Sequence, residues 1–268
     1  MHDMFAEPHP DTHTLGAGRT AWALRPNNVD LAPPPLAPLH IHLEAEPAAI
    51  DLELHRSAVI IVDMQNNFCA PGGLTDALGV DLTPERAPIA PLSATLPLLR
   101  AADVPVIWLN WGHRADQKNL SPQALYAFRY NGRSSGIGSP LPGGRGPVLE
   151  KGSWSAAVVD ELAPDPADIQ VDKYRVSGFW DTPLDSILRN LDVRTIFFAG
   201  VNLDMCVFHT LADAHFLGYN CVLLEDCCGT TAPQFCTDAT LWNIKKAFGF
   251  VAGSAPLRAA IRTATSAG

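Results

Sequence analysis

The sequence has little positive charge, since 19 Lys and Arg residues face 28 Asp and Glu residues, giving a formal net charge of -9. Such a chain gains little by neutralising phosphates, which disfavours nucleic acid as a partner. No stretch approaches the roughly 20 apolar residues needed to cross a bilayer, and the first residues lack the apolar core of a secretory leader. We therefore expect a cytoplasmic protein that binds neither nucleic acid nor membrane.

Patterns that bind metals or nucleotides are also missing. The nine histidines include no His-Glu-x-x-His pattern, and no Gly-rich phosphate loop follows an apolar run. Adjacent Cys227 and Cys228 do not supply the spaced ligands of a zinc site. We expect no metal and no organic cofactor. A chain of this size does not need disulfides, so its six cysteines are expected to be reduced thiols.

What the sequence does contain is enough apolar material for one large core, with 47% hydrophobic and 18% charged residues. Residues 1–55 differ from the rest, with eight prolines and little periodicity. They predict an extended proline-rich N-terminal arm before a folded domain at 56–268. This arm is either a loose tail or a segment that lies on a neighbouring subunit, because Trp22 and Leu31 favour burial. We accordingly expect a homodimer or homotetramer.

The folded part alternates apolar runs with helical stretches. The runs are 58–62, 104–109, 169–171, 195–199, 221–224 and 250–251, and the helical stretches are 92–102, 155–162, 184–191, 206–217 and 235–248. This alternation predicts an α/β fold, with three α/β/α layers around an open parallel six-stranded sheet. Ligands bind beyond the carboxyl ends of strands in such sheets, so the residues after each run are the ones to examine.

Two charged residues stand at such strand ends. Asp63 follows the run 58–62, and its alternative role is to cap the next turn. Lys173 follows the run 169–171 after one Asp, although a lone lysine is most often a surface residue. Together, the two predict a charged pair in the crevice.

Cys206 is the most specific candidate. A strand, a Gly turn and a thiol at the start of a predicted helix combine what a nucleophile needs. The helix dipole and a nearby cation favour the thiolate, and the N–H groups of the first helical turn can hold an oxyanion. The alternative is a buried structural cysteine, which we accept for Cys221, Cys227, Cys228 and Cys236.

These segments resemble the isochorismatase-like cysteine hydrolases over about residues 55–255. The matching motifs, in the order of that family, are Val62-Asp-Met-Gln-Asn-Asn-Phe68, the strand-end Lys173 and Gly200-Val-Asn-Leu-Asp-Met-Cys206. The stretch from Lys173 to Leu188 is most similar to ureidoacrylate amidohydrolases. Segments 112–116 and 223–229 are more similar to biuret hydrolases, and triuret hydrolase fits this intermediate character.

The resemblance implies a catalytic triad of Asp63, Lys173 and Cys206. It also implies a cis peptide between Val201 and Asn202 that directs the N–H groups of Asn202 and Cys206 into an oxyanion hole. The chain departs from the family at Leu203, where Thr is common, and at Asn202, where a small residue is common. The Asp-x-His metal set of the nicotinamidase branch is missing.

We expect Lys173 to stabilise the Cys206 thiolate while Asp63 accepts the proton, which leaves the sulfur ionised at neutral pH. The substrate would be a small linear ureido compound of the ureidoacrylate, biuret or triuret type. Alternatives are an amidase of N-carbamoyl amino acids or nicotinamide, a true isochorismatase, and a catalytically silent binding domain. For substrate binding we expect Gln65, Phe68, Asn110, Trp111 and Trp180, with Arg114 or Arg175 for a substrate carboxylate.

Overall fold

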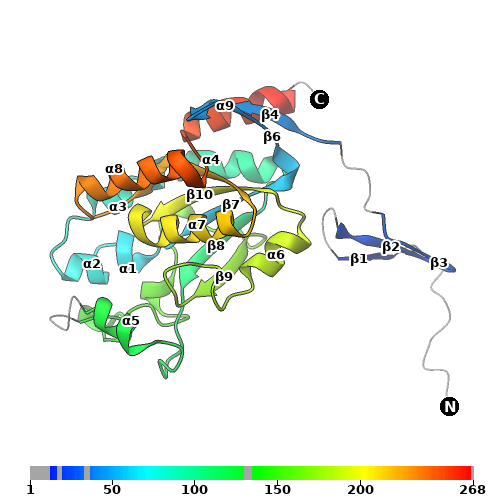
Figure 1. Ribbon diagram of the computed structural model, residues 1–268. Coiled ribbons are helices and arrows are strands. Elements are labelled where there is room, and N and C mark those ends of the chain that lie inside the picture. The colour runs from blue at the N-terminus through cyan, green and yellow to red at the C-terminus, as the bar shows by residue number, and fades with distance from the viewer. Residues whose placement is uncertain (1–12, 17–19, 33–36, 130–134, 267–268) are drawn as a thin grey trace, which may run out of the picture.

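A mostly parallel sheet forms the centre of the protein in the computed structural model, which describes residues 13–16, 20–32, 37–129 and 135–266 (Figure 1). All six predicted strands are present and parallel to their neighbours. They are β7 (Ser57–Val62), β8 (Val106–Trp111), β9 (Ile169–Lys173), β10 (Thr195–Val201), β11 (Asn220–Gly229) and β12 (Phe250–Ala252). The prediction of an α/β fold with a parallel sheet is therefore confirmed.

The six-strand count is wrong, because the sheet has a seventh strand. β5 (Ala45–Glu46) pairs antiparallel with β12, and the order is β5-β12-β11-β10-β7-β8-β9. Next to it, β4 (His40–Leu43) and β6 (Ile50–Glu53) form a two-stranded sheet. Leu43 in β4 and Leu54, the residue directly after β6, are fully buried. The end of the predicted arm therefore belongs to the core, because alternate residues of β4 turn their apolar side chains inward.

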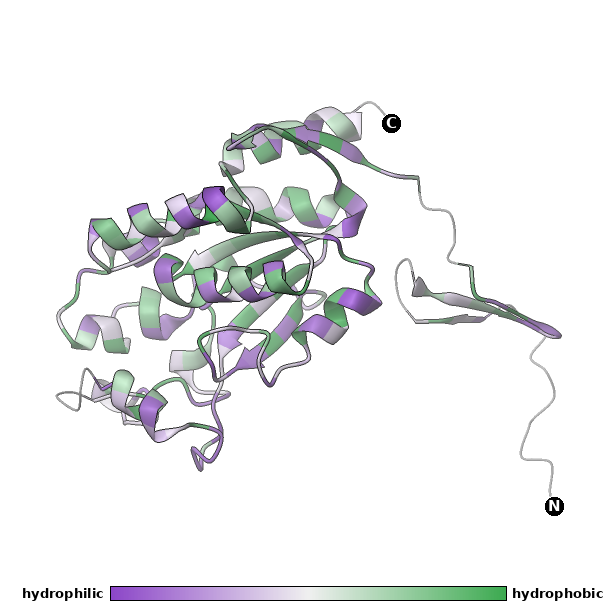
Figure 2. Ribbon diagram, in the orientation of Figure 1, coloured by the Kyte–Doolittle hydropathy of each residue, from purple (hydrophilic) through white to green (hydrophobic). Residues whose placement is uncertain are grey.

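Helices cover both faces of the sheet, as the strand order and right-handed crossovers require (Figure 1). α4 (Ile89–Ala101) and α9 (Ser254–Ser266) lie on one face; α6 (Leu184–Asn190), α7 (Phe208–Phe216) and α8 (Gln234–Asn243) lie on the other. Short helices α1 (Asn66–Cys69), α2 (Leu74–Ala77), α3 (Thr83–Arg86) and α5 (Pro122–Ala127) lie in the connections. Figure 2 shows mostly apolar strands in the sheet and a mixture of polar and apolar residues on the helices, with Phe216, Phe235 and Trp242 exposed on α7 and α8. No helix among the described residues is long and apolar enough to span a membrane.

One predicted helix is wrong, and the predicted stretches include neither the short helices α1, α2, α3 and α5 nor the C-terminal helix. The stretch 155–162 forms two 3₁₀ turns, η4 (Trp154–Ala156) and η5 (Asp160–Leu162), because it lies in a long connection whose backbone bonds to other loops. For example, the N–H of Val159 donates to the carbonyl of Met64. The C-terminal helix α9 was missed, although it buries Leu257 and Ile261 at helical spacing.

The front part of the arm has its own small sheet, formed by β1 (His13–Leu15), β2 (Trp22–Arg25) and β3 (Asn28–Asp30). Figure 1 shows this sheet standing away from the domain. Leu15, Trp22, Val29 and Leu31 are about half exposed, at 46 to 58%. The predicted arm at residues 1–12, 17–19 and 33–36 lies outside the described residues.

Candidate active site

The candidate site lies where the strand order reverses, between β7 and β10. From β7 the chain proceeds to β8 on one side, and from β10 it proceeds to β11 on the other. A crevice opens at such a switch point beyond the carboxyl ends of the strands. Gly200 allows the close approach of the two strands, because a Cβ atom there, at a φ of +112°, would lie 2.0 Å from the carbonyl oxygen of Val62.

Asp63 and Lys173 meet at this edge as a buried ion pair. Lys173 Nζ lies 2.8 Å from Asp63 Oδ2, and the two side chains are 0% and 1% exposed. Asp63 has a φ of +52°, an uncommon conformation for a residue other than glycine, and such residues gather at functional sites. Burial raises the pKa of Asp63, and the attraction of Lys173 opposes that rise. The capping alternative for Asp63 and the surface alternative for Lys173 therefore do not describe this site.

Cys206 lies beside this pair, at the end of the segment that follows β10. A π-helical turn, η6 (Leu203–Val207), contains it and continues into α7. Burial raises the pKa of the Cys206 thiol to about 12, while Lys173 lowers it and Asp63 raises it. This direction is opposite to the expected thiolate at neutral pH, because loss of solvent outweighs the nearby ammonium group.

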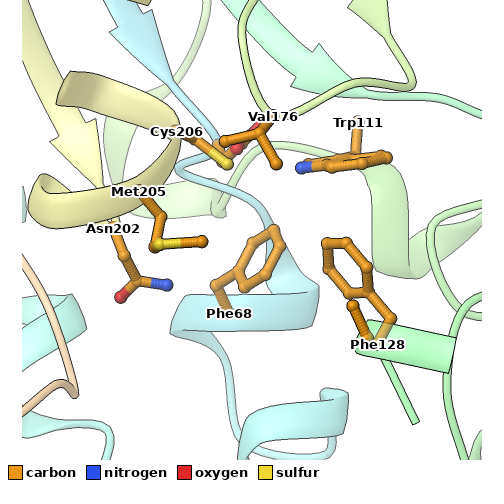
Figure 3. Close-up of a pocket in the computed structure, with 9 residues that line it drawn as sticks. Phe68, Trp111, Phe128, Val176, Asn202, Met205 and Cys206 are labelled. Carbon is orange, nitrogen blue, oxygen red and sulfur yellow. The ribbon is translucent and has the colours of Figure 1, made fainter. Parts of the chain in front are cut away.

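A cavity of about 360 Å³ opens over Cys206 (Figure 3). Most of its wall is apolar or aromatic. The lining residues are Asp63, Phe68, Trp111, Ala127, Phe128, Val176, Asn202, Met205 and Cys206. Two predicted binding residues, Phe68 and Trp111, thus lie where they were expected. Phe128 was missed because nothing in the sequence ties α5 to the sheet, whereas Met205 could have been found as the neighbour of Cys206.

Gln65 is close to the site but does not line the cavity. Its Nε2 donates to the carbonyls of Trp111 at 2.8 Å and Ala156 at 2.7 Å, and its Oε1 accepts the N–H of Trp111 at 3.0 Å. The side chain is fully buried. The structure does not place the predicted substrate contact of Gln65 in the cavity, because these backbone contacts occupy its amide group.

Three other predicted contacts are also placed elsewhere. Trp180 is 63% exposed, and its Nε1 donates to Asp213. Arg114 pairs with Asp116, and Arg175 pairs with Asp181, so neither guanidinium lines the cavity. These positions follow strand ends in sequence, but their loops carry the side chains outward.

Asn110 is buried in β8, next to Trp111 but outside the cavity lining. Adjacent residues of a strand point to opposite faces, so when Trp111 faces the cavity Asn110 does not. Its Oδ1 has no hydrogen-bond partner among the described residues. The expected contact between Asn110 and substrate is therefore not supported by the geometry.

The implied cis peptide between Val201 and Asn202 is present. Asn202 lines the cavity, and Figure 3 shows its side-chain nitrogen directed toward Phe68. Its Oδ1 accepts the N–H of Thr231 at 3.4 Å. Its side chain also bonds to Glu85, whose pKa is raised to about 7 by burial and lowered in part by this contact. Sequence reasoning missed Glu85, because α3 is far along the sequence from the strand ends, although it packs against the end of β11 in the structure.

All six cysteines are free thiols. Within the described ranges, no three His, Cys, Asp or Glu side chains are grouped closely enough to hold a metal ion. Asp63, Lys173 and Cys206 can together perform proton transfer and nucleophilic attack by sulfur.

Comparison with protein families gives one match that spans most of the chain. A family model described as the isochorismatase domain matches residues 57–256. This range contains Asp63, Lys173 and Cys206 as well as all six parallel strands.

Solved structures with the same arrangement include a cysteine hydrolase from Pseudomonas syringae pv. phaseolicola. It is 28% identical to the chain, with a TM-score of 0.67, and the match covers 80% of this chain and 95% of that one. An N-carbamoylsarcosine amidase from Thermoplasma acidophilum is 24% identical, with a TM-score of 0.57 and coverage of 74% and 96%. An isochorismatase family protein from Desulfovibrio vulgaris is 22% identical, with a TM-score of 0.62 and coverage of 77% and 98%. The last two share the fold.

Proposed function

We propose, since this chain belongs to the isochorismatase family of hydrolases, that it is a cysteine amidase that cleaves a C–N bond of a small ureido or amide compound. One observation carries the proposal. A buried thiol, Cys206, lines a cavity beside Asp63, whose carboxylate is 2.8 Å from the ammonium group of Lys173. A nucleophile, a base and a cation in one enclosed site are the parts that acyl transfer to sulfur requires.

Proton transfer in this mechanism accompanies attack. Because burial raises the thiol pKa, Asp63 takes the proton of Cys206 as the sulfur approaches the carbonyl carbon. Burial makes the Asp63 carboxylate a stronger base than a solvated one. Lys173 stabilises the negative charge that passes from carboxylate to sulfur.

In the later steps the same residues act again, and Asp63 now donates the proton that it accepted. The new C–S bond gives a tetrahedral oxyanion, which the N–H groups of Asn202 and Cys206 would hold, at about 3 kcal/mol per donor. Asp63 then gives its proton to the departing nitrogen as the C–N bond breaks. A thioester-like acyl or carbamoyl enzyme remains, and water activated by Asp63 hydrolyses it, returning the proton to sulfur.

The cavity wall supports a flat substrate. Phe68, Trp111 and Phe128 offer aromatic faces, and the side chain of Asn202 offers N–H groups. Among the described residues, no Lys or Arg head group lines the cavity. Among the linear ureido compounds we favour the ureidoacrylate type, because its conjugated body is planar and partly apolar, with its carboxylate toward the opening. Biuret and triuret are the next candidates.

Other activities of the family are kept as alternatives. Amidases of N-carbamoyl amino acids share the ureido chemistry, whereas nicotinamide requires room for a pyridine ring. A true isochorismatase would not need the thiol of Cys206. A catalytically silent domain would bind a ureido compound without cleaving it.

The test is release of ammonia, directly or from carbamate, across a panel of ureidoacrylate, biuret, triuret, N-carbamoyl amino acids and nicotinamide. We expect turnover of at least one ureido compound, and a mass increase on Cys206 when the reaction is stopped early. Cys206→Ser should abolish turnover, and Cys236→Ser, a partly exposed thiol outside the cavity, serves as the matched control. Turnover that survives Cys206→Ser would refute the proposal.

A further inference from the structure

Trp111 carries a polar atom that the mechanism above does not use. Its side chain is 1% exposed and lines the cavity, and its Nε1 has no hydrogen-bond partner of good geometry among the described residues. A buried donor without a partner costs roughly 1 to 3 kcal/mol. By contrast, the indole N–H groups of Trp180 and Trp108 donate to Asp213 and Asp168. The N–H of Trp111 therefore points to a neighbouring group that becomes a good acceptor only during the reaction.

The orientation of the ring identifies that group. Figure 3 shows the indole nitrogen of Trp111 on the side of the ring that faces Cys206 and Val176. Val176 has no polar side-chain atom. The Cys206 sulfur is a weak hydrogen-bond acceptor as a thiol and a strong one as a thiolate.

We propose that the indole N–H of Trp111 is a catalytic hydrogen-bond donor to the sulfur of Cys206 and binds it most strongly when that sulfur is ionised. This inference rests on the proposed function. When the S–H bond breaks, the proton goes to Asp63 and the electron pair stays on sulfur, where the indole N–H meets it. A donor that is unpaired in the resting site and paired in the ionised site lowers the barrier rather than the ground state.

Lys173 strengthens this donor. Its ammonium group lies over the indole ring, 4.2 Å from the ring centroid, because Trp111 and Lys173 are register partners on β8 and β9. A cation over the ring face withdraws electron density, which makes the N–H more acidic. An edge contact with Phe128, at 4.9 Å between centroids, also holds the ring. The interaction of Trp111 with Cys206 also acts to lower the thiol pKa.

The experiment measures alkylation of Cys206 by iodoacetamide from pH 7 to 10, followed by mass spectrometry of its peptide. Trp111→Phe removes the N–H, and we expect the Cys206 rate to fall by about tenfold or more at each pH, the size expected for a lost hydrogen bond to a charged group. The matched control is Trp242→Phe, which makes the same change at an exposed tryptophan of α8. It should leave the rate unchanged.

A second replacement separates the N–H from the shape of the ring. Benzothienylalanine at position 111 keeps the bicyclic ring and has sulfur in place of N–H, so it also answers the question if Trp111→Phe fails to fold. Equal Cys206 rates in this protein and the wild type would overturn the inference while the proposed function stands. A wild-type Cys206 that reacts no faster than buried Cys227 would refute the proposed function itself.

Discussion

Replacement of Lys173 by Met tests the buried ion pair that the site depends on. The substitution keeps a side chain of similar length and removes the ammonium group 2.8 Å from Asp63 Oδ2. At an effective dielectric constant of about 20, the attraction across that distance is roughly 6 kcal/mol. Loss of the favourable partner leaves a buried charge, and such losses cost about 3 to 5 kcal/mol. We expect a decrease of that size in the free energy of unfolding at pH 8.

The pH dependence of the loss identifies its cause. Without Lys173 the folded-state pKa of Asp63 rises further above the unfolded value, so the carboxyl group prefers its proton in the fold. The penalty is therefore small below the unfolded pKa and grows as the pH rises. Urea unfolding of Lys173→Met from pH 4 to 8 should show the difference from wild type widening with pH.

A double variant, Asp63→Asn with Lys173→Met, is the control. It removes both charges, so most of the lost stability should return at pH 8, while amidase activity stays absent. Urea midpoints and slopes, together with ammonia release, measure both. If Lys173→Met unfolds with the wild-type free energy at pH 8, or if the double variant is less stable than the single, the two charges do not compensate each other.

Three further outcomes are expected. Burial raises the folded pKa of Glu85 from 4.5 to about 7, so the stability that its protonated form contributes is lost as the pH rises through that value. The wild type should therefore lose about 3 kcal/mol of unfolding free energy between pH 5 and 8 that Glu85→Gln does not lose. An equal dependence of the urea unfolding free energy on pH in both proteins would refute this. The amidase rate should fall as the pH drops through the raised pKa of Asp63, so an acid limb at or below the ordinary value of 3.8 in a kcat/KM profile would exclude it as the base. We propose that the exposed apolar residues of β1 to β3 contact a second copy in a homodimer or homotetramer. Deletion of residues 1–38 should then lower the number of chains per particle, obtained by light scattering as the measured mass divided by the chain mass. An unchanged number of chains would refute that role.

The parts of the fold that the sequence predicts are those with strong local patterns. The strand β7 is a continuous run of buried residues that ends at a charge, which is why both its position and the importance of Asp63 could be inferred. The strand β5 has two residues and pairs only through the tertiary fold, so no periodicity marks it. The stretch 155–162 shows the opposite error. Its residues favour a helix, but hydrogen bonds to other loops hold it in two 3₁₀ turns.

The site divides in a similar way. That Asp63, Lys173 and Cys206 lie close together could be predicted, because strand ends converge at a switch point and their segments match a family in order. The substrate wall could not, because it depends on which way a loop turns its side chains. Trp180 shows this, since it follows a strand by seven residues and still faces solvent. Phe128 shows the converse, because it comes from a helix far from any strand end.

The contacts of Gln65 have one more consequence. They hold only main-chain atoms of residue 111, so the position of that strand end does not depend on which side chain grows from it. A different residue at 111 would meet the same scaffold and the same sulfur. A substitution at residue 111 should therefore change the contact with Cys206 while leaving the strand end in place.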